Sequence, residues 1–98
     1  MNIQRQIGLN LRRLRLARDI SQHAIALDVE MSLSYLSNIE RGQANPSVGL
    51  IGKIADSLGV SPSEFFLPIS PKDVPTKNLR RGRNVHHQGR RSPKPRKR

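Results

Sequence analysis

The stretch SQHAIALDVEMSLSYLSNIERG, residues 21–42, contains two short helical segments joined by a tight link. Ser21 and Ser32 favour the N-cap position of a helix, and Gly42 favours the position just beyond a helix end. One helix is therefore predicted from about Gln22 to Val29, and a second after Ser32 up to Gly42.

The second of these helices has two unlike sides. At about 100° per residue, Leu36 and Ile39 lie on one side, with Tyr35 at its edge. The opposite arc, about 140° wide, carries mostly short polar side chains with little charge: Leu33, Ser34, Ser37, Asn38 and Arg41. Two helices joined by such a link, the second with a lightly charged outer side, indicate a helix-turn-helix. A helix of this kind fits the major groove of DNA and reads base edges.

Helices are also predicted on both sides of this pair. In residues 3–18 the apolar side chains recur at helical spacing and form one stripe, which consists of Ile3, Ile7, Leu11 and Leu14. Pro46 and Ser47 begin a further helix, and Gly59 ends it. The apolar side of that helix consists of Val48, Ile51, Ile54, Ala55 and Leu58.

A last helical turn begins at Ser61-Pro62 and carries Phe65, Phe66 and Leu67. No segment alternates apolar and polar residues over the length of a strand, so no sheet is predicted. The sequence therefore predicts an all-α fold, a compact bundle of five short helices.

The charge divides the chain into two parts. Its 98 residues leave room for one small domain, and the formal net charge is +11. Residues 1–69 hold seven basic and six acidic side chains, whereas residues 70–98 hold eleven basic and one acidic. The second part has few apolar residues and several prolines and glycines. We expect a helical domain over residues 1–69 and a disordered basic C-terminal tail over residues 70–98.

Several functional classes are not supported by the composition. There is no cysteine, no apolar run of membrane-spanning length and no secretory leader, so we expect a soluble cytoplasmic protein without a membrane partner. The histidines, His23, His86 and His87, have no cysteine or carboxylate nearby at ligand spacing, so no metal or other cofactor is expected. No motif for catalysis or for a small-molecule ligand is present, and we do not expect an enzyme.

Residues 5–67 resemble the Cro/phage-repressor (XRE-type) helix-turn-helix family of bacterial and phage regulators. The motifs that carry the resemblance are Ser21-Gln22, YLSNIERG at 35–42, Asn45-Pro46-Ser47 and LGVS at 58–61. The resemblance implies a lambda-repressor-like bundle in a bacterial or phage-encoded, nucleoid-associated regulator. It also implies a homodimer on a pseudo-palindromic operator, with dimer contacts near Phe65, Phe66 and Leu67.

The candidate DNA contacts fall into two groups. Base edges are expected to be read by Leu33, Ser34 and Asn38, through a thymine methyl group and through hydrogen bonds. Phosphate or sugar contacts are expected from Tyr35, Ser37, Arg41, Gln43, Asn45 and Ser47. The resemblance adds Gln22 to the phosphate contacts. The alternative interpretation of all these residues is an ordinary polar surface.

Two further residues acquire a role from the resemblance, and one departs from it. Arg15 and Glu40 are expected to form a partly buried ion pair that joins two helices and orients the helix that reads DNA. Glu30 stands where the family usually has the glycine of the link. A left-handed conformation at Glu30 would cost about 1–2 kcal/mol, so we expect either that cost or a link of another shape.

The basic tail is expected to bind DNA without choosing bases, through Arg80, Arg81, Arg83, Arg90, Arg91, Lys94, Arg96, Lys97 and Arg98. Arg81-Gly82-Arg83 resembles the core of an AT-hook, a reader of the minor groove, but the proline that normally follows is missing. Two rival functions stay open. One is an antitoxin-like module that binds DNA and a protein partner, and the other is RNA binding through the tail.

Overall fold

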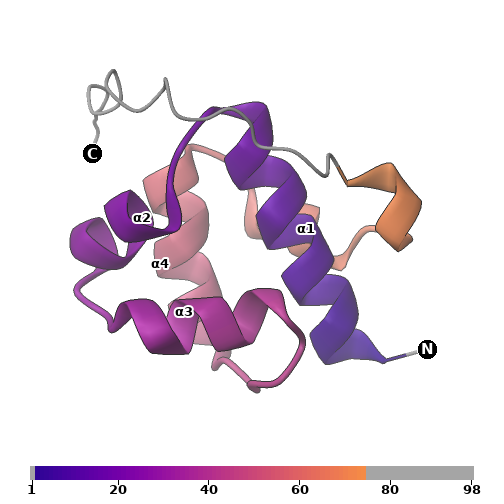
Figure 1. Cartoon of the computed structure of the whole chain (residues 1–98), viewed down its shortest axis with the longest axis horizontal. Coiled ribbons are helices and arrows are strands. Elements are labelled where there is room, and N and C mark those ends of the chain that lie inside the picture. Colours follow the sequence, from indigo (N-terminus) through magenta and orange to yellow (C-terminus); the bar gives the residue numbers. More distant parts are fainter. Residues whose placement is uncertain (1, 75–98) are drawn as a thin grey trace.

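The computed structural model describes residues 2–74, so the predicted tail contacts from Arg80 to Arg98 lie outside the described residues (Figure 1). The α-helices are α1 (Ile3–Ala17), α2 (Gln22–Val29), α3 (Leu33–Glu40) and α4 (Val48–Leu58). Two short 3-10 helices follow, η1 (Pro62–Phe66) and η2 (Pro71–Asp73). Residues 2–74 contain no strand, which confirms the all-α prediction. The predicted count of five short helices is not confirmed: residues 2–74 contain four α-helices, and the predicted last turn after Ser61 is a 3-10 helix.

Each α-helix begins where a side-chain oxygen satisfies a free backbone N–H of the first turn. The four N-cap residues and the N–H groups that they accept are Asn2 with Arg5, Ser21 with Ala24, Ser32 with Tyr35, and Ser47 with Leu50. These are local hydrogen bonds over three residues, so the starts at Ser21, Ser32 and Ser47 could be predicted from the sequence.

Each α-helix ends in a Schellman turn with one residue in the left-handed region, at Asp19, Glu30, Gly42 and Gly59. The next residue then donates its N–H to a carbonyl of the last helical turn, as Met31 does to Ala26 at 2.9 Å. Ile20, Met31 and Val60 follow three of these turns and pack against the core. Glu30 has φ 63° and ψ 49°, so the link between α2 and α3 keeps the left-handed shape although no glycine is present.

One hydrophobic core joins all four α-helices and η1. It consists of Ile7, Leu11, Leu14, Ile25, Ala26, Leu36, Ile39, Ile51, Ile54, Ala55, Leu58 and Phe65. Two predicted core residues do not belong to it: Ile3 is 49% exposed and Val48 is 84% exposed. Both occupy the first position of their helix, where a side chain points back toward the N-terminus, away from the rest of the helix.

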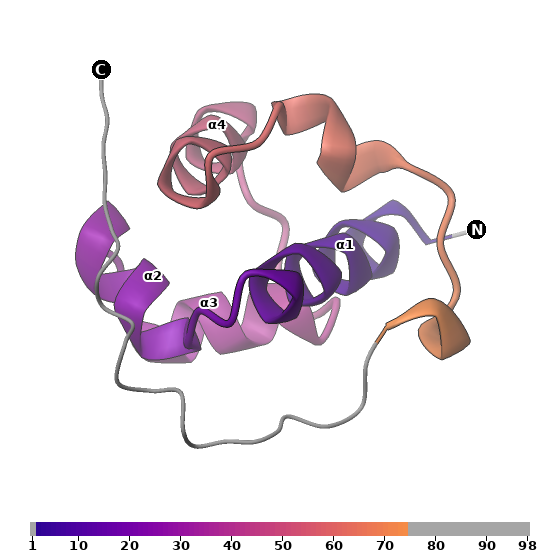
Figure 2. The same cartoon turned by 90° about the horizontal axis from the view of Figure 1, so that it is seen from above.

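Helix α3 packs against both α1 and α2, while α4 packs against α2 and η1 (Figure 2). The contact between α1 and α3 is close because it occurs at Gly8. A Cβ atom on residue 8 would overlap the carbonyl oxygen of Ile39 and lie 2.6 Å from that of Glu40. The backbones of α1 and α3 can therefore approach this closely only if residue 8 has no side chain.

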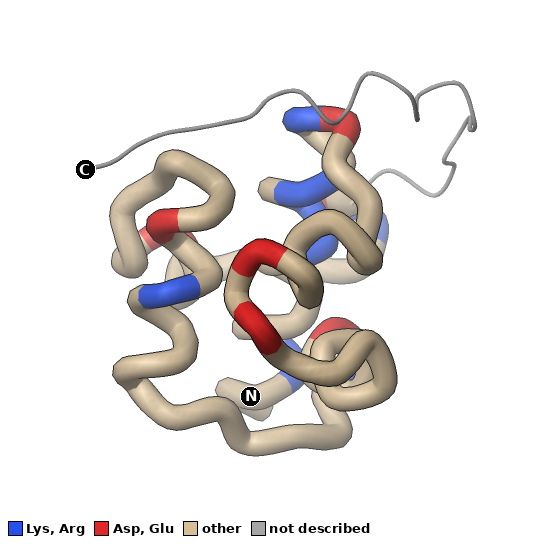
Figure 3. The backbone as a smooth tube through the Cα atoms, turned by 90° about the vertical axis from the view of Figure 1, so that its left-hand side faces the viewer, with Lys and Arg blue, Asp and Glu red and all other residues tan. Residues whose placement is uncertain are grey.

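The described residues are almost electrically neutral, because residues 2–74 contain eight Lys or Arg side chains and seven Asp or Glu side chains. Four of these cations lie on α1, where Figure 3 shows the basic residues gathered. Helix α3 and its C-cap carry one arginine, Arg41, and one carboxylate, Glu40.

Polar side chains of α1 hold the segment that follows η1. Asn10 is fully buried, and its Nδ2 donates to the carbonyl oxygens of Phe65 at 3.0 Å and Leu67 at 2.9 Å. Its Oδ1 accepts from Nε and Nη2 of Arg13 at 3.1 and 3.0 Å. Gln6 Nε2 donates to the carbonyl oxygens of Phe66 and Leu67 at 3.2 and 2.5 Å. This polar anchoring was not predicted from the sequence.

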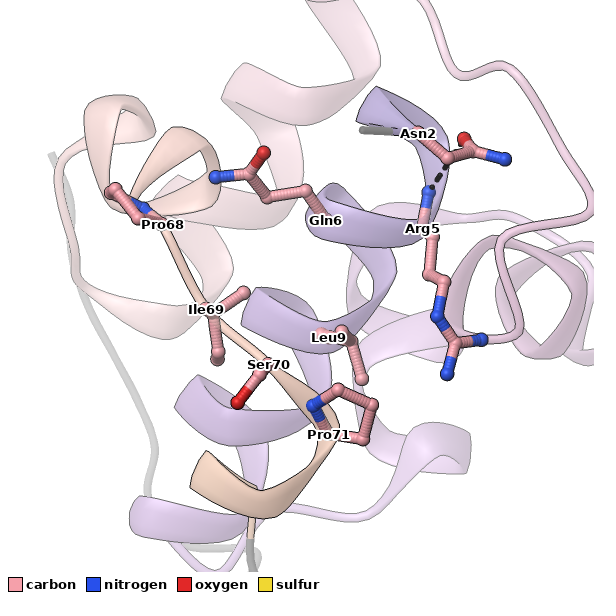
Figure 4. Close-up of a pocket in the computed structure, with 8 residues that line it drawn as sticks. All are labelled: Asn2, Arg5, Gln6, Leu9, Pro68, Ile69, Ser70 and Pro71. Atoms are coloured by element: carbon pink, nitrogen blue, oxygen red, sulfur yellow. Dashed lines mark hydrogen bonds between the residues drawn. The ribbon is translucent and has the colours of Figure 1, made fainter.

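The chain then runs back along α1 from Pro68 to Pro71 (Figure 4). A shallow, open pocket of about 250 Å³ lies between this segment and Asn2, Arg5, Gln6 and Leu9 of the α1 end. The segment ends in η2, where the backbone N–H and then the hydroxyl of Ser70 donate to the Asp73 carboxylate and hold the pKa of Asp73 below its ordinary value. Val74 is buried.

Candidate nucleic-acid interface

Helix α3 is buried on one side only. Leu36 and Ile39 lie in the core, whereas Leu33 and Ser34 are exposed and Asn38 is half-buried on the other side. We call the set Leu33, Ser34, Ser37, Asn38 and Arg41 the outer face of α3. Its members are exposed or half-buried, and they include all three residues predicted to read bases.

Arg41, the C-cap of α3, binds three other candidate contact residues. Its Nη2 donates to Oδ1 of Asn38 at 2.5 Å, and its Nη1 donates to Oγ of Ser37 at 3.2 Å. Its Nε donates to Oε1 of Gln43 at 3.4 Å. The structure therefore brings these four predicted DNA contacts into one cluster of side chains.

The side chain of Gln22, the first residue of α2, bridges to α3. Its Nε2 donates to Oε1 of Glu40 at 2.9 Å, and its Oε1 accepts from Oγ of Ser37 at 3.4 Å. The predicted phosphate contact of Gln22 is compatible with this geometry, because an amide nitrogen has a second N–H available to donate.

Arg15 and Glu40 form a two-point ion pair between α1 and α3. Nε of Arg15 lies 2.6 Å from Oε2 of Glu40, and Nη2 lies 3.1 Å from Oε1. The two side chains are 10% and 3% exposed, respectively. Nη1 of Arg15 also donates to the carbonyl oxygen of Ile20 at 3.1 Å. This pair fixes the C-terminal end of α3 against α1.

The loop between α3 and α4 holds the remaining candidate contacts. Gln43, Asn45 and Ser47 are exposed, and Tyr35 lies at the edge of the outer face of α3. Oγ of Ser47 accepts from the N–H of Leu50 at 3.0 Å, so this hydroxyl already serves as the N-cap of α4. The first turn of α4 adds the positive end of a helix dipole beside this loop.

Two other kinds of site have no counterpart in the part of the chain that the structure describes. No three His, Cys, Asp or Glu side chains between residues 2 and 74 are grouped to hold a metal ion, and His23 is exposed. His86 and His87 lie outside the described residues. None of the helices described here combines the length and the apolar character needed to span a bilayer.

Helix α2, a tight link and helix α3, whose outer face is open and polar, are packed on the rest of the bundle. This arrangement defines a helix-turn-helix protein. A family model described as helix-turn-helix matches residues 11–65, more than half of the chain. The chain belongs to this XRE-type helix-turn-helix family of transcriptional regulators. The resemblance predicted from the sequence is thereby confirmed.

Proteins similar to this chain are named as a transcriptional regulator, as control proteins and as a phage repressor. It is 35% identical over 68 residues to the uncharacterized HTH-type transcriptional regulator y4dJ of Sinorhizobium fredii, and the match covers 69% of this chain and 88% of that protein. It is 38% identical over 66 residues to the control protein C.BamHI of Bacillus amyloliquefaciens, covering 66% of this chain and 82% of the relative. The immunity repressor of Bacillus phage phi105 is 33% identical over 57 residues, which are 58% of this chain and 40% of the repressor.

The fold also matches solved structures. The restriction-modification controller protein C.AhdI of Aeromonas hydrophila superimposes with a TM-score of 0.62 at 38% identity, covering 64% of this chain and 96% of that chain. A hypothetical transcription factor, NHTF, of Neisseria gives a TM-score of 0.64 at 28% identity over 72% of this chain and 79% of that chain. None of these five proteins is named as an enzyme or as an antitoxin.

Proposed function

We propose that this protein is a sequence-specific transcriptional regulator that binds double-stranded DNA as a homodimer on a pseudo-palindromic operator. The observation that carries the proposal is the outer face of α3, which is open, almost uncharged and built on a helix that two other helices hold in place. A surface that bound only phosphates would carry several cations, and this face carries Arg41 alone.

Three residues of this face are the proposed readers of bases. Leu33 packs on a thymine methyl group, Ser34 donates to or accepts from a base edge, and the amide of Asn38 hydrogen-bonds a base. The ion pair of Arg15 with Glu40 orients α3 for this contact without touching DNA.

Residues around this face position the protein on the duplex. The proposed phosphate and sugar contacts are those of Gln22, Tyr35, Ser37, Arg41, Gln43, Asn45 and Ser47. Because residues 2–74 are nearly neutral, much of the attraction to the polyanion falls to the basic tail.

The proposed dimer contact involves the chain just after the core residue Phe65. Phe66 and Leu67 are 45% and 43% exposed and adjacent, and their carbonyl oxygens are held by Gln6 and Asn10. A fixed apolar pair of this kind suits a two-fold contact between copies. Two copies would present two α3 helices to successive turns of the major groove, about 34 Å apart.

Selection of bound duplexes from a random DNA pool tests this function. We expect an enriched site with two inverted half-sites, and two chains per duplex by sedimentation. Asn38→Ala should lose the preference at one position of each half-site, whereas the matched amide variant Gln4→Ala on α1 should keep the full site. A pool that shows no enrichment, or RNA bound as tightly as the best duplex, would contradict the proposal.

A further inference from the structure

We propose that Arg41 determines which base Asn38 reads, because it binds the oxygen of the Asn38 amide and thereby turns the NH2 group of that amide toward DNA. The proposal rests on the function proposed above and makes it more specific. Arg41 is a specificity-determining residue in this view, and it acts through Asn38.

Arg41 is held in place at three points. Its Nη2 contacts Asn38 Oδ1 at 2.5 Å, its Nη1 contacts Ser37 Oγ at 3.2 Å, and its Nε contacts Gln43 Oε1 at 3.4 Å. A hydrogen bond from a guanidinium to an amide oxygen is charge-assisted, and a planar group held at three points has little freedom to turn.

Backbone hydrogen bonds keep the partners of Arg41 close to one another. The N–H of Gln43 donates to the carbonyl oxygen of Asn38 at 2.9 Å, and that of Gly42 donates to Ile39 at 3.0 Å. This Schellman turn brings Gln43 back beside Asn38, so Arg41 lies between two amide side chains that both accept from it.

Hydrogen bonds also connect Arg41 and its partners to the buried ion pair of Arg15 with Glu40. Ser37, which accepts from Arg41, donates to Gln22, and Gln22 donates to Glu40 at 2.9 Å. Glu40 in turn pairs with Arg15. The anchor of Arg41 is thus connected by hydrogen bonds to the buried Arg15–Glu40 ion pair between α1 and α3.

The consequence for recognition follows from the groove edges. An asparagine with both amide groups free pairs with adenine, because adenine offers N7 as an acceptor and N6 as a donor. Because the Asn38 oxygen is turned toward Arg41, the NH2 group is the part of the amide that faces the base in this proposal, and a donor there meets the N6 donor of adenine. Guanine offers two acceptors, N7 and O6, and thymine offers O4. At the position that Asn38 reads, we therefore expect a base with a keto group, and we expect guanine to be preferred over thymine.

Selection from a random duplex pool with four proteins tests this inference: wild type, Asn38→Ala, Arg41→Ala and Arg18→Ala. The position that loses its preference in Asn38→Ala is the position that Asn38 reads. The wild type should prefer guanine or thymine there, and Arg41→Ala should raise adenine relative to guanine by about tenfold or more. Arg18→Ala removes an exposed arginine of the α1 end and should leave that preference unchanged.

Three results would overturn the inference: adenine preferred by the wild type, an unchanged preference in Arg41→Ala, or a preference lost without any gain of adenine. The last result would make Arg41 the direct reader. If Asn38→Ala changed no position of an enriched site, this inference and the role of Asn38 would fail together, while DNA binding itself would stand. If no duplex were enriched at all, the proposed function would fail. Thermal unfolding of Arg41→Ala should match the wild type and exclude an effect through folding.

Discussion

The carboxylate of Glu40, the last residue of α3, lies within 2.6 Å of the Arg15 guanidinium of α1, and only 3% of its side chain is exposed. The same carboxylate accepts from Gln22 of α2. One buried anion thus joins three helices at the place where the outer face of α3 ends.

We expect Arg15→Ala and Glu40→Ala each to lower the free energy of unfolding by about 3 kcal/mol, because each substitution leaves a buried charge without its partner. The double substitution should cost clearly less than the sum, with a coupling energy of about 1–3 kcal/mol. Urea unfolding of the four proteins measures this cycle. The control is Arg12→Ala, because the Arg12 side chain is 40% exposed and its Nη1 lies 3.8 Å from Oε1 of Glu40. Such an exposed pair contributes little, so we expect the free energy of unfolding to fall by less than about 0.5 kcal/mol. Additive single costs would rule out a coupled pair.

Asn10→Ala should be destabilising although it removes only a small polar side chain. The substitution leaves the carbonyl oxygens of Phe65 and Leu67 without this donor and takes the acceptor from Arg13. Buried groups that lose a partner cost about 1–3 kcal/mol each, so we expect a loss of about 3 kcal/mol in urea unfolding. Gln4→Ala on the same helix serves as the control. A loss below about 1 kcal/mol would mean that water replaces the amide.

Glu30→Gly should stabilise the domain. Glu30 adopts φ 63°, a region that costs a residue with a Cβ atom about 1–2 kcal/mol and costs glycine little. Glycine loses more conformational entropy on folding, which offsets part of this benefit. We therefore expect the free energy of unfolding to rise by about 0.5–1 kcal/mol. Glu30→Ala removes the charge but keeps the Cβ atom, so it should show no such gain. Equal melting temperatures of the Gly and Ala variants would contradict this explanation.

Removal of residues 75–98 should leave the helical domain folded, since the buried Val74 is kept. Affinity for every duplex should fall, and the plot of log affinity against log salt should become shallower by about 0.9 for each lost phosphate contact. The rank order of preferred sites should stay the same. Titrations at several salt concentrations measure both slopes. An unchanged slope would assign the tail to a partner other than DNA.

The helix boundaries could be predicted from the sequence because local groups determine them. Ser21, Ser32 and Ser47 cap within three residues, and Gly42 and Gly59 adopt the left-handed turns. The exposure of Val48 could not be predicted in this way. A helical stripe gives the direction of a side chain but not whether a neighbouring element extends far enough to cover it.

The site was only partly predictable for a related reason. The outer face of α3 follows from spacing along one helix, so Leu33, Ser34 and Asn38 could be placed together. The contact between Arg41 and Asn38 depends on rotamers, and the anchoring of η1 by Asn10 depends on residues that are 55 positions apart. A signal for that anchoring does exist, because Gln6, Asn10 and Arg13 recur at helical spacing beside the apolar stripe of α1.

Gly8 gives the bundle a mutational weak point on the buried side of α3, opposite its outer face. A methyl group there would collide with the backbone of α3 and tilt that helix away from α1. In a genetic screen for loss of regulation, substitutions of Gly8 would therefore be recovered together with those of the residues proposed to read DNA. Such an allele would be misread as a contact mutation unless its folding were assayed, since a side chain at position 8 lies against the backbone of α3 and not on the outer face.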